Sequence, residues 1–324
     1  DQPDLIINAA LIPNEDVAAV ILNLQENEIL LDGESWLAKR GDSSIKVNYK
    51  GEAVLMLKER WDIFQLNGAA IESDFQLLTE GRVSQELSES NILIGPAENL
   101  FMEEGAKIEG AIINTTAGPV YLASGAEIME GSLVRGPLAL CEGAVLKMGS
   151  KVYSATTLGP YSVAGGEISN VVFWGYSNKG HDGFLGNAVL GEWCNIGADT
   201  NASNLKNTYD EVKVWNYASG RFDRSGQQFC GLIMGDHSKC GINTMFNTGT
   251  VVGVACNLFG AGFPRQFVPD FSWGGAQGFV THKLDAVHKT ANLVMPRRKR
   301  TYGDFEKSVM EAVFAVTEPL RGEG

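Results

Sequence analysis

Basic residues are scarce in this chain, and long apolar runs are absent from it. The 324 residues include 26 Lys and Arg against 39 Asp and Glu, which gives a formal net charge of −13 at pH 7. Nucleic-acid binding depends on clustered positive charge, so no nucleic-acid partner is expected. The one basic run, at 297–300, is interpreted as a solvated helix end or a local anion contact.

Membrane and export signals are also lacking. No apolar run reaches about 18 residues, so no transmembrane helix and no membrane partner are expected. No signal peptide is visible. The chain begins at Asp1 without Met and in mid-pattern, and we therefore expect its natural N-terminus to lie upstream.

Cysteine is sparse, with five residues and no CxxC pair. Cys141, Cys194 and Cys240 fall at apolar repeat positions, where a free thiol acts as a small hydrophobe. An odd number of free thiols favours a reducing, cytoplasmic location. The spacing of Cys, His and Asp indicates no structural zinc site.

Glycine, by contrast, is abundant, with 38 residues concentrated in a repeat. Gly105, Gly125 and Gly143 open the similar segments GAKIEG, GAEIMEG and GAVLKMG, at spacings of 20 and 18 residues. A period near 18 corresponds to three hexapeptides, and such self-similarity predicts a triangular solenoid from about 92 to 260. Hexapeptide β-solenoids mostly belong to acyltransferases and nucleotidyltransferases. The repeat therefore favours these two enzyme classes as well as a solenoid fold.

Three parts follow from these patterns. Residues 1–90 form a partial α/β segment, with a helix capped by Asn14 and a linking helix over 61–82. Residues 91–275 form the β-helix, interrupted by a long polar loop at 201–230 that has a ligand-facing composition. Residues 276–324 form a helical tail, divided at Pro296, that caps the last coil or binds a neighbouring subunit.

His181 has the most suggestive surroundings of the four histidines. It lies at a predicted corner between coils, next to Lys179 and Asp182. A histidine beside a carboxylate in a cleft is a good general base. The alternative, a turn histidine bonded to its own loop, is equally consistent with the pattern.

The segment from Glu167 to Asn204 resembles the acetyltransferase half of the bifunctional N-acetylglucosamine-1-phosphate uridyltransferase–glucosamine-1-phosphate acetyltransferase superfamily. The match is without gaps and includes Glu167–Ile168, Asn170, His181, Gly186, Gly191, Asn195–Ala198 and Asn204. It implies that His181 is the catalytic base and that Asn204 contacts an amino sugar. It also implies a left-handed parallel β-helix, a homotrimer, and coenzyme contacts at Ala198 and Gly241.

Several positions depart from that family's pattern. Ser169 stands where the family has a phosphate-binding Lys, and Phe184 stands where it has a Tyr. A loop Lys falls on Asp210, although Lys206 and Lys213 lie close and are expected, with Lys179 and Phe184, to bind substrate. A Ser that assists at the acyl group falls on Ile242. Replacing polar side chains that bind a substrate changes an enzyme's specificity steeply. The family's own substrate is therefore not assigned to this chain.

The resemblance implies a mainly β transferase that acts on a sugar phosphate or sugar nucleotide. The first hypothesis is an acyltransferase that uses acetyl-CoA or another acyl-CoA. The second is a sugar-1-phosphate nucleotidyltransferase whose Gly-rich phosphate loop lies upstream, in which case Mg²⁺ is expected. The third is a non-catalytic solenoid that binds a sugar nucleotide or serves assembly.

Overall fold

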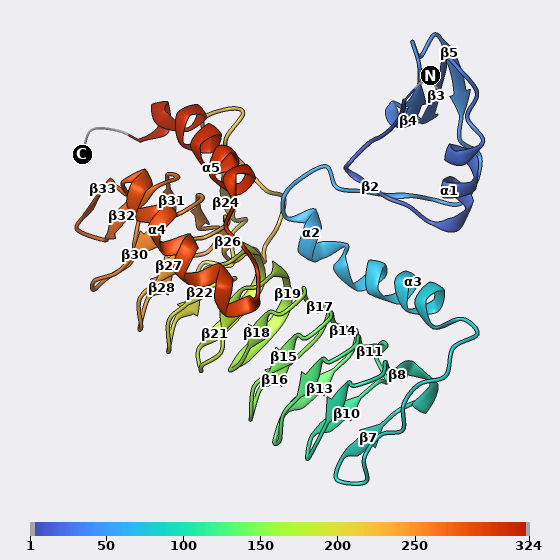
Figure 1. The fold of residues 1–324 in the computed structure, drawn as a ribbon, viewed down its shortest axis with the longest axis horizontal. Helices are drawn as coiled ribbons and strands as arrows, with labels where there is room; N and C mark the ends of the chain where they lie inside the picture. The colour runs from blue at the N-terminus through green and yellow to red at the C-terminus, as the bar shows by residue number, and fades with distance from the viewer. Residues whose placement is uncertain (1–3, 322–324) are drawn as a thin grey trace. The chain divides into compact units, whose positions relative to one another are not determined.

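The computed structural model describes residues 4–321, which divide into two compact units, Asp1–Leu66 and Asn67–Gly324 (Figure 1). The division interrupts the linking helix expected over 61–82. Its first turn, α2 (Asp62–Gln65), belongs to the first unit, and α3 (Asn67–Thr79) belongs to the second. The boundaries at 90 and 275 stay predictions.

The first unit is a small α/β structure around its own apolar core. The elements are β1 (Leu5–Ile7), β2 (Leu11–Ile12), α1 (Glu15–Leu22), β3 (Glu28–Asp32), β4 (Ser35–Arg40), β5 (Ile45–Asn48) and β6 (Leu55–Met56). One sheet has the order β1-β4-β3-β5, and β2 pairs with β6. Asn14 caps α1 as expected, because its side-chain oxygen accepts the Val17 N–H at 2.9 Å. The α1 residues Val17 and Ile21 are buried in the core of this unit.

The second unit is a parallel β-helix with three faces, which confirms the predicted fold class. Face 1 contains β7 (Ile92–Ile94), β10 (Ile112–Asn114), β13 (Leu133–Arg135), β16 (Lys151–Val152), the starts of β19 (Glu167–Gly175) and β21 (Phe184–Glu192), β23 (Asn201–Ala202) and β28 (Met245–Phe246). Face 2 contains β8 (Leu100–Met102), β11 (Val120–Leu122), β14 (Leu138–Leu140), β17 (Thr156–Leu158), the ends of β19 and β21, β26 (Ile233–Met234), β29 (Val251–Val252) and β31 (Phe267–Val268).

Face 3 completes each coil. It contains β9 (Lys107–Ile108), β12 (Glu127–Ile128), β15 (Val145–Leu146), β18 (Val163–Ala164), β20 (Asn178–Lys179), β22 (Asn195–Ile196), β27 (Lys239–Cys240), β30 (Asn257–Leu258) and β32 (Ser272–Gly275). The inward residues of all three faces form one continuous core. Because β19 and β21 are nine residues long and cross a corner, they join faces 1 and 2 into one sheet.

The glycine repeat marks the corner between faces 2 and 3. Gly105, Gly125 and Gly143 have φ of 80°, 68° and 62°, the left-handed region that glycine adopts without a steric penalty. The next coils place Tyr161, Tyr176, Trp193 and His237 at this position, all with positive φ. A bulky residue in this conformation costs about 1–3 kcal/mol, so its surroundings must hold it there.

Stacking of these rings supplies part of that support. The Tyr161, Tyr176, Trp193 and His237 rings follow one another, with centroid distances of 5.7, 4.3 and 6.2 Å. We call these four residues the aromatic corner. Arg300 lies over the Tyr176 ring, and its Nε donates to the Tyr176 hydroxyl at 2.9 Å.

The tail covers the aromatic corner and the last coils. It comprises α4 (Leu284–Val294), the short helix η2 (Met295–Arg298), α5 (Asp304–Val316) and η3 (Glu318–Leu320). Ala291 and Met295 pack with Trp193, and Met310 packs with Phe271. As expected, α4 ends just before Pro296.

Both ends of the β-helix are covered. Before the first coil, Gln85 donates its backbone N–H to the Met102 carbonyl, and Leu87 packs against the core. After the last coil, β33 (Gly278–Thr281) turns back antiparallel to β32. The long interruption contains a hairpin of β24 (Lys213–Asn216) and β25 (Arg221–Arg224), anchored by stacking of Trp215 on Phe267 at 4.1 Å.

We expect Trp193→Ala to destabilise the second unit by about 3–5 kcal/mol, the usual result of truncating a buried aromatic residue. The Trp193 side chain is 5% exposed, and it packs against its neighbouring rings and against the tail. Urea unfolding followed by circular dichroism measures the loss. Trp174→Ala, at a position 57% exposed, is the matched control. Equal stability of the two variants would contradict the anchoring role of the aromatic corner.

Candidate functional site

Three of the four histidines are engaged within the fold. His237 belongs to the aromatic corner, and burial lowers its pKa to about 4. His282 Nδ1 lies 2.9 Å from the Ala255 carbonyl oxygen, and His288 Nδ1 lies 2.6 Å from the Tyr302 hydroxyl. Within the described chain the imidazole of His181 is exposed and makes no hydrogen bond. Its backbone, rather than its ring, is fixed.

The turn that carries His181 lies at the corner between faces 3 and 1. It is stacked on the following coil, where the Asp199 N–H donates to the Asp182 carbonyl at 3.1 Å. Gly183 has φ of 111°, and a Cβ there would lie 2.2 Å from the Thr200 carbonyl oxygen. Only glycine fits this close approach, so the sequence fixes a sharp turn directly after the histidine.

Lys179 lies inside the β-helix, just before this turn. It takes an inward position of β20, paired with Ala164 of the preceding coil, and is 1% exposed. Its Nζ donates to the Gly165 and His181 carbonyl oxygens, both at 2.9 Å. Burial lowers the pKa of Lys179 to about 8, against the opposing effect of Asp182 and Asp199. The substrate contact expected from the sequence stays a prediction for this enclosed side chain.

Asn204 and Phe184 lie together on face 1. A Cβ added to Gly186 would meet the Phe184 ring at 2.6 Å and the Asn204 Nδ2 at 2.7 Å, so both side chains lie over this glycine. Asn204 Nδ2 also donates to the Asn187 side-chain oxygen at 2.7 Å. The structure therefore brings two predicted site residues onto one surface, on the face that begins at the His181 turn. Asn187, the hydrogen-bond partner of Asn204, was not identified from the sequence.

The two loop lysines differ in their availability. Lys206 is half-buried, and its Nζ donates to the Glu211 carbonyl at 2.6 Å, which holds the loop. Lys213 is exposed on β24. Substrate contacts by these two residues stay predictions.

The predicted coenzyme positions lie on the same corner as His181, in the next two coils. The Ala198 carbonyl accepts the Asn243 N–H at 2.8 Å, which joins the two turns. A Cβ on Gly241 would make ordinary van der Waals contacts, at 3.7 Å, with Leu258 and Phe259 of the following coil, so this glycine is partly covered. Ile242 beside it is 69% exposed and adds apolar surface. The corner thus offers an exposed apolar side chain at Ile242.

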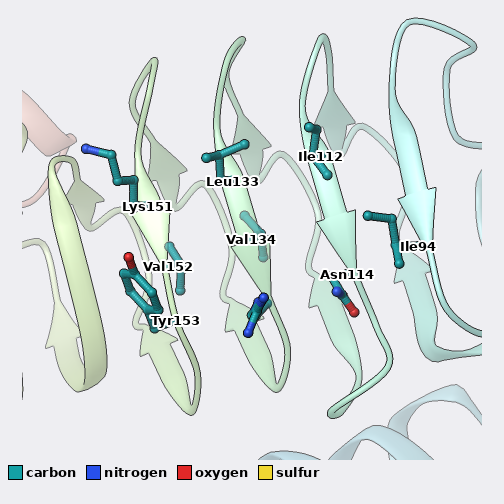
Figure 2. A pocket seen from close by; sticks show the side chains of 9 residues that line it. Ile94, Ile112, Asn114, Leu133, Val134, Lys151, Val152 and Tyr153 are labelled. Atoms are coloured by element: carbon teal, nitrogen blue, oxygen red, sulfur yellow. The ribbon is translucent and has the colours of Figure 1, made fainter.

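Face 1 carries a groove of about 330 Å³ over the first four coils (Figure 2). Figure 2 shows side chains from four neighbouring strands along it, among them Ile94, Ile112, Leu133 and Tyr153. Three of these, Ile94, Leu133 and Tyr153, are exposed. Farther along, the same face bears Phe184 and Gly186, so the groove and the candidate site share one surface.

A cavity of about 510 Å³ lies elsewhere, between α5 and the aromatic corner. It is lined by Tyr176, Trp193 and His237 on one side and by Phe305 and Val309 on the other. None of the residues predicted from the sequence lines it.

Clustered metal ligands and membrane-spanning helices are both absent from the described residues. Between 4 and 321, no three His, Cys, Asp or Glu side chains are grouped to hold a metal ion. Over the same range, no helix has the length and apolar character needed to span a membrane.

The N-terminal part of the chain matches a known family. Residues 1–83 match the sequence model of the sugar nucleotidyl transferase family. The bifunctional protein GlmU of Methanocaldococcus jannaschii is 38% identical over 76 residues, which are 24% of this chain and 18% of that protein. The bifunctional sugar-1-phosphate nucleotidylyltransferase/acetyltransferase of Sulfurisphaera tokodaii is 29% identical over 93 residues, which are 29% of this chain and 23% of that protein. These matches confirm the resemblance to this superfamily, although they span less than a quarter of either relative.

Among solved structures, the chain matches the polySia-specific acetyltransferase NeuO, at 9% identity, with a TM-score of 0.33 over 70% of this chain and 94% of that one. The UDP-N-acetylglucosamine acyltransferase of Arabidopsis has 14% identity and a TM-score of 0.28 over 71% and 92%. Both TM-scores are low. The fold assignment accordingly depends on the strand register of this chain.

Gly186→Ala is expected to displace the Phe184 ring or to break the Asn204–Asn187 hydrogen bond, because the added Cβ occupies their space. A crystal structure of the variant measures both positions. Gly175→Ala is the control, since a Cβ there meets nothing closer than 3.6 Å. Unmoved Phe184 and Asn204 side chains in Gly186→Ala would contradict the close packing described for face 1.

Proposed function

Because this chain is related to the superfamily of bifunctional sugar-1-phosphate nucleotidyltransferase/acetyltransferases, we propose that its β-helix is an acyl-CoA-dependent acyltransferase. Its acceptor is a sugar phosphate or a related amino sugar. The observation that carries the proposal is the state of His181. This imidazole is exposed and unbonded within the described chain, whereas its backbone is firmly held.

In the proposed reaction, His181 removes the proton from the acceptor amine or hydroxyl as that atom attacks the thioester carbonyl. The carbon–sulfur bond then breaks, and the coenzyme leaves as its thiol after protonation. Asn204 and the Phe184 ring orient the acceptor on face 1. Because the positions over Gly186 are already filled by these two side chains, the acceptor is positioned by their outer surfaces.

The acyl-CoA is proposed to lie along the corner that continues from His181, past Ala198 and Gly241. The exposed Ile242 beside Gly241 offers apolar surface for an elongated, partly apolar arm. Acetyl-CoA is the simplest donor to test. Ile242 adds no hydroxyl at this place, so hydrogen-bond assistance to the acyl group must come from elsewhere in the site.

A sugar-1-phosphate nucleotidyltransferase is the second candidate function. It is favoured by the match of residues 1–83 to the sugar nucleotidyl transferase family. A Gly-rich loop that cradles nucleotide phosphates, with Mg²⁺, is needed for that chemistry. Nucleotidyl transfer by the natural full-length protein, without any acyl transfer, would favour it over the first proposal. Inertness in both assays would favour a non-catalytic sugar-nucleotide-binding or assembly role.

We further propose that the protein is a homotrimer in which face 1 contacts a second copy. The exposed apolar side chains of the groove favour burial, since removing apolar surface from water contributes about 25 cal/mol per Å². The strands that line the groove and β21, which carries Phe184, belong to the same face of the β-helix. A second copy seated on it would therefore border the candidate site and help to exclude water there.

His181→Ala is expected to lower acetyl transfer about 10²–10⁴-fold, the usual contribution of a general base. Acyl-CoA turnover is followed by release of free thiol, with glucosamine-1-phosphate and related sugar phosphates as acceptors. Asn204→Ala should lower kcat by a smaller factor and should also weaken the apparent affinity for the acceptor. A circular dichroism spectrum identical to that of the wild type controls for folding. Unchanged turnover in folded His181→Ala would rule out the catalytic role.

Leu133→Asp is expected to dissociate the trimer, because it replaces an exposed apolar side chain of the groove with a carboxylate that would have to leave water on assembly. Size-exclusion chromatography with light scattering measures the mass against the 34.9 kDa of one chain. Leu22→Asp, at an exposed site of the first unit, is the matched control. A wild-type protein that stays at 34.9 kDa at micromolar concentration would overturn the proposed assembly.

A further inference from the structure

Lys179 occupies an inward position of face 3, where the neighbouring coils have apolar side chains. On face 3 the equivalent inward positions hold Ile128, Leu146 and Ala164 before it and Ile196 after it. The small Ala164 side chain directly below leaves room for the longer lysine. A charged amine in this core is unfavourable unless it is paired and hydrogen-bonded. Its presence therefore calls for a reason other than packing.

The contacts of Lys179 show where it acts. Its Nζ bonds two carbonyls from adjacent coils, Gly165 on one side and His181 on the other, each at 2.9 Å. Gly165 and the His181 turn are close neighbours, since a Cβ on Gly166 would lie 3.0 Å from the His181 carbonyl oxygen. The amine thus ties the turn that carries the exposed imidazole to the coil beneath it.

We propose that Lys179 is a positioning residue for His181, which it holds by the backbone from inside the β-helix. This inference rests on the proposed acyltransferase function. Lys179 does not contact substrate in this role. It fixes the turn so that the imidazole, which has no hydrogen bond of its own, projects from a rigid support. A displacement of about 1 Å at a reacting group costs up to about 100-fold in rate, so such support is effective.

The charges around Lys179 agree with this role. Asp182 and Asp199, on the outside of the corner, favour its protonated form, and Cys240 acts in the same direction. Burial is the larger influence, and it lowers the pKa of Lys179 to about 8. Since the folded-state pKa lies below that of a free lysine, the charged amine opposes folding below pH 8. This penalty is lost as the pH rises from about 8 through 10.5.

Lys239 provides a matched comparison on the same face. Burial also lowers its pKa, and its Nζ donates to the His237 carbonyl at 2.9 Å and the Trp193 carbonyl at 3.4 Å. It therefore ties turns of the aromatic corner in the way that Lys179 ties the His181 turn. Neither of these hydrogen bonds involves residues 180–183.

The test compares Lys179→Met with Lys239→Met in steady-state acetyl transfer. Lys179→Met removes the two hydrogen bonds but keeps the length and apolar stem of the side chain. We expect kcat to fall about 10–100-fold while KM for acetyl-CoA and for the acceptor stays unchanged, and the thermal midpoint at pH 7 to stay equal or rise. Lys239→Met should leave kcat unchanged. Lys179→Gln keeps an N–H donor without a charge, so its kcat should lie between those of the wild type and Lys179→Met. If Lys179→Met does not fold, Lys179→Gln takes its place in the test.

Hydrogen exchange measured by mass spectrometry gives a readout independent of turnover. In Lys179→Met, the amides of Glu167 and Asp199, which donate to the Gly183 and Asp182 carbonyls of this turn, should exchange about 10-fold or more faster than in the wild type, whereas Lys239→Met should leave them unchanged. If the wild type shows no acyl transfer, the proposed function fails, and the exchange rates still decide whether Lys179 holds the turn. Wild-type kcat, or wild-type exchange at the Glu167 and Asp199 amides, in folded Lys179→Met would overturn the inference.

Discussion

Backbone hydrogen bonds between successive coils determine where every outward side chain of the β-helix lies. Each coil satisfies its N–H and C=O groups with the coils on either side, so a residue keeps its face only if its coil stays in register. The pairs Lys107–Glu127, Glu127–Val145 and Val145–Val163 show how steadily this register is kept. Deviations from it are therefore informative. The coil from Val163 to Asn178 is shorter, and it is the coil that ends in the Lys179–His181 turn.

The fold was predictable because its signal is periodic. Gly105, Gly125 and Gly143 are spaced by one coil and need positive φ, so the solenoid and one of its corners could be inferred from the sequence. The aromatic corner could not, because nothing in the sequence says that Tyr161 or Trp193 takes over the turn position of a glycine. That substitution is possible because the rings stack and the tail packs on them, and these are contacts between distant parts of the chain.

The identity of the candidate site residues was predictable from the sequence, but the role of each side chain was less so. Resemblance selected His181, Phe184 and Asn204, and the structure places Phe184 and Asn204 together over Gly186. Lys179 was selected for its charge beside His181, but a sequence does not show whether a strand residue points inward. Alternation along β20 directs it into the core. Asn187 and Gly186 are distant from Asn204 in the sequence. The register of β21 against β23 brings them beside it.

The covering of both ends has a consequence for how copies of this molecule can meet. An uncovered last coil is a template on which another chain could add strands, and repetition would give a fibre. Here the segment around Gln85 and Leu87 blocks one end, and the reversed strand β33 with the tail helices blocks the other. Coils cannot continue from one molecule into the next. Copies can therefore join only sideways, through the flat faces, and such lateral contacts can close into a ring of finite size.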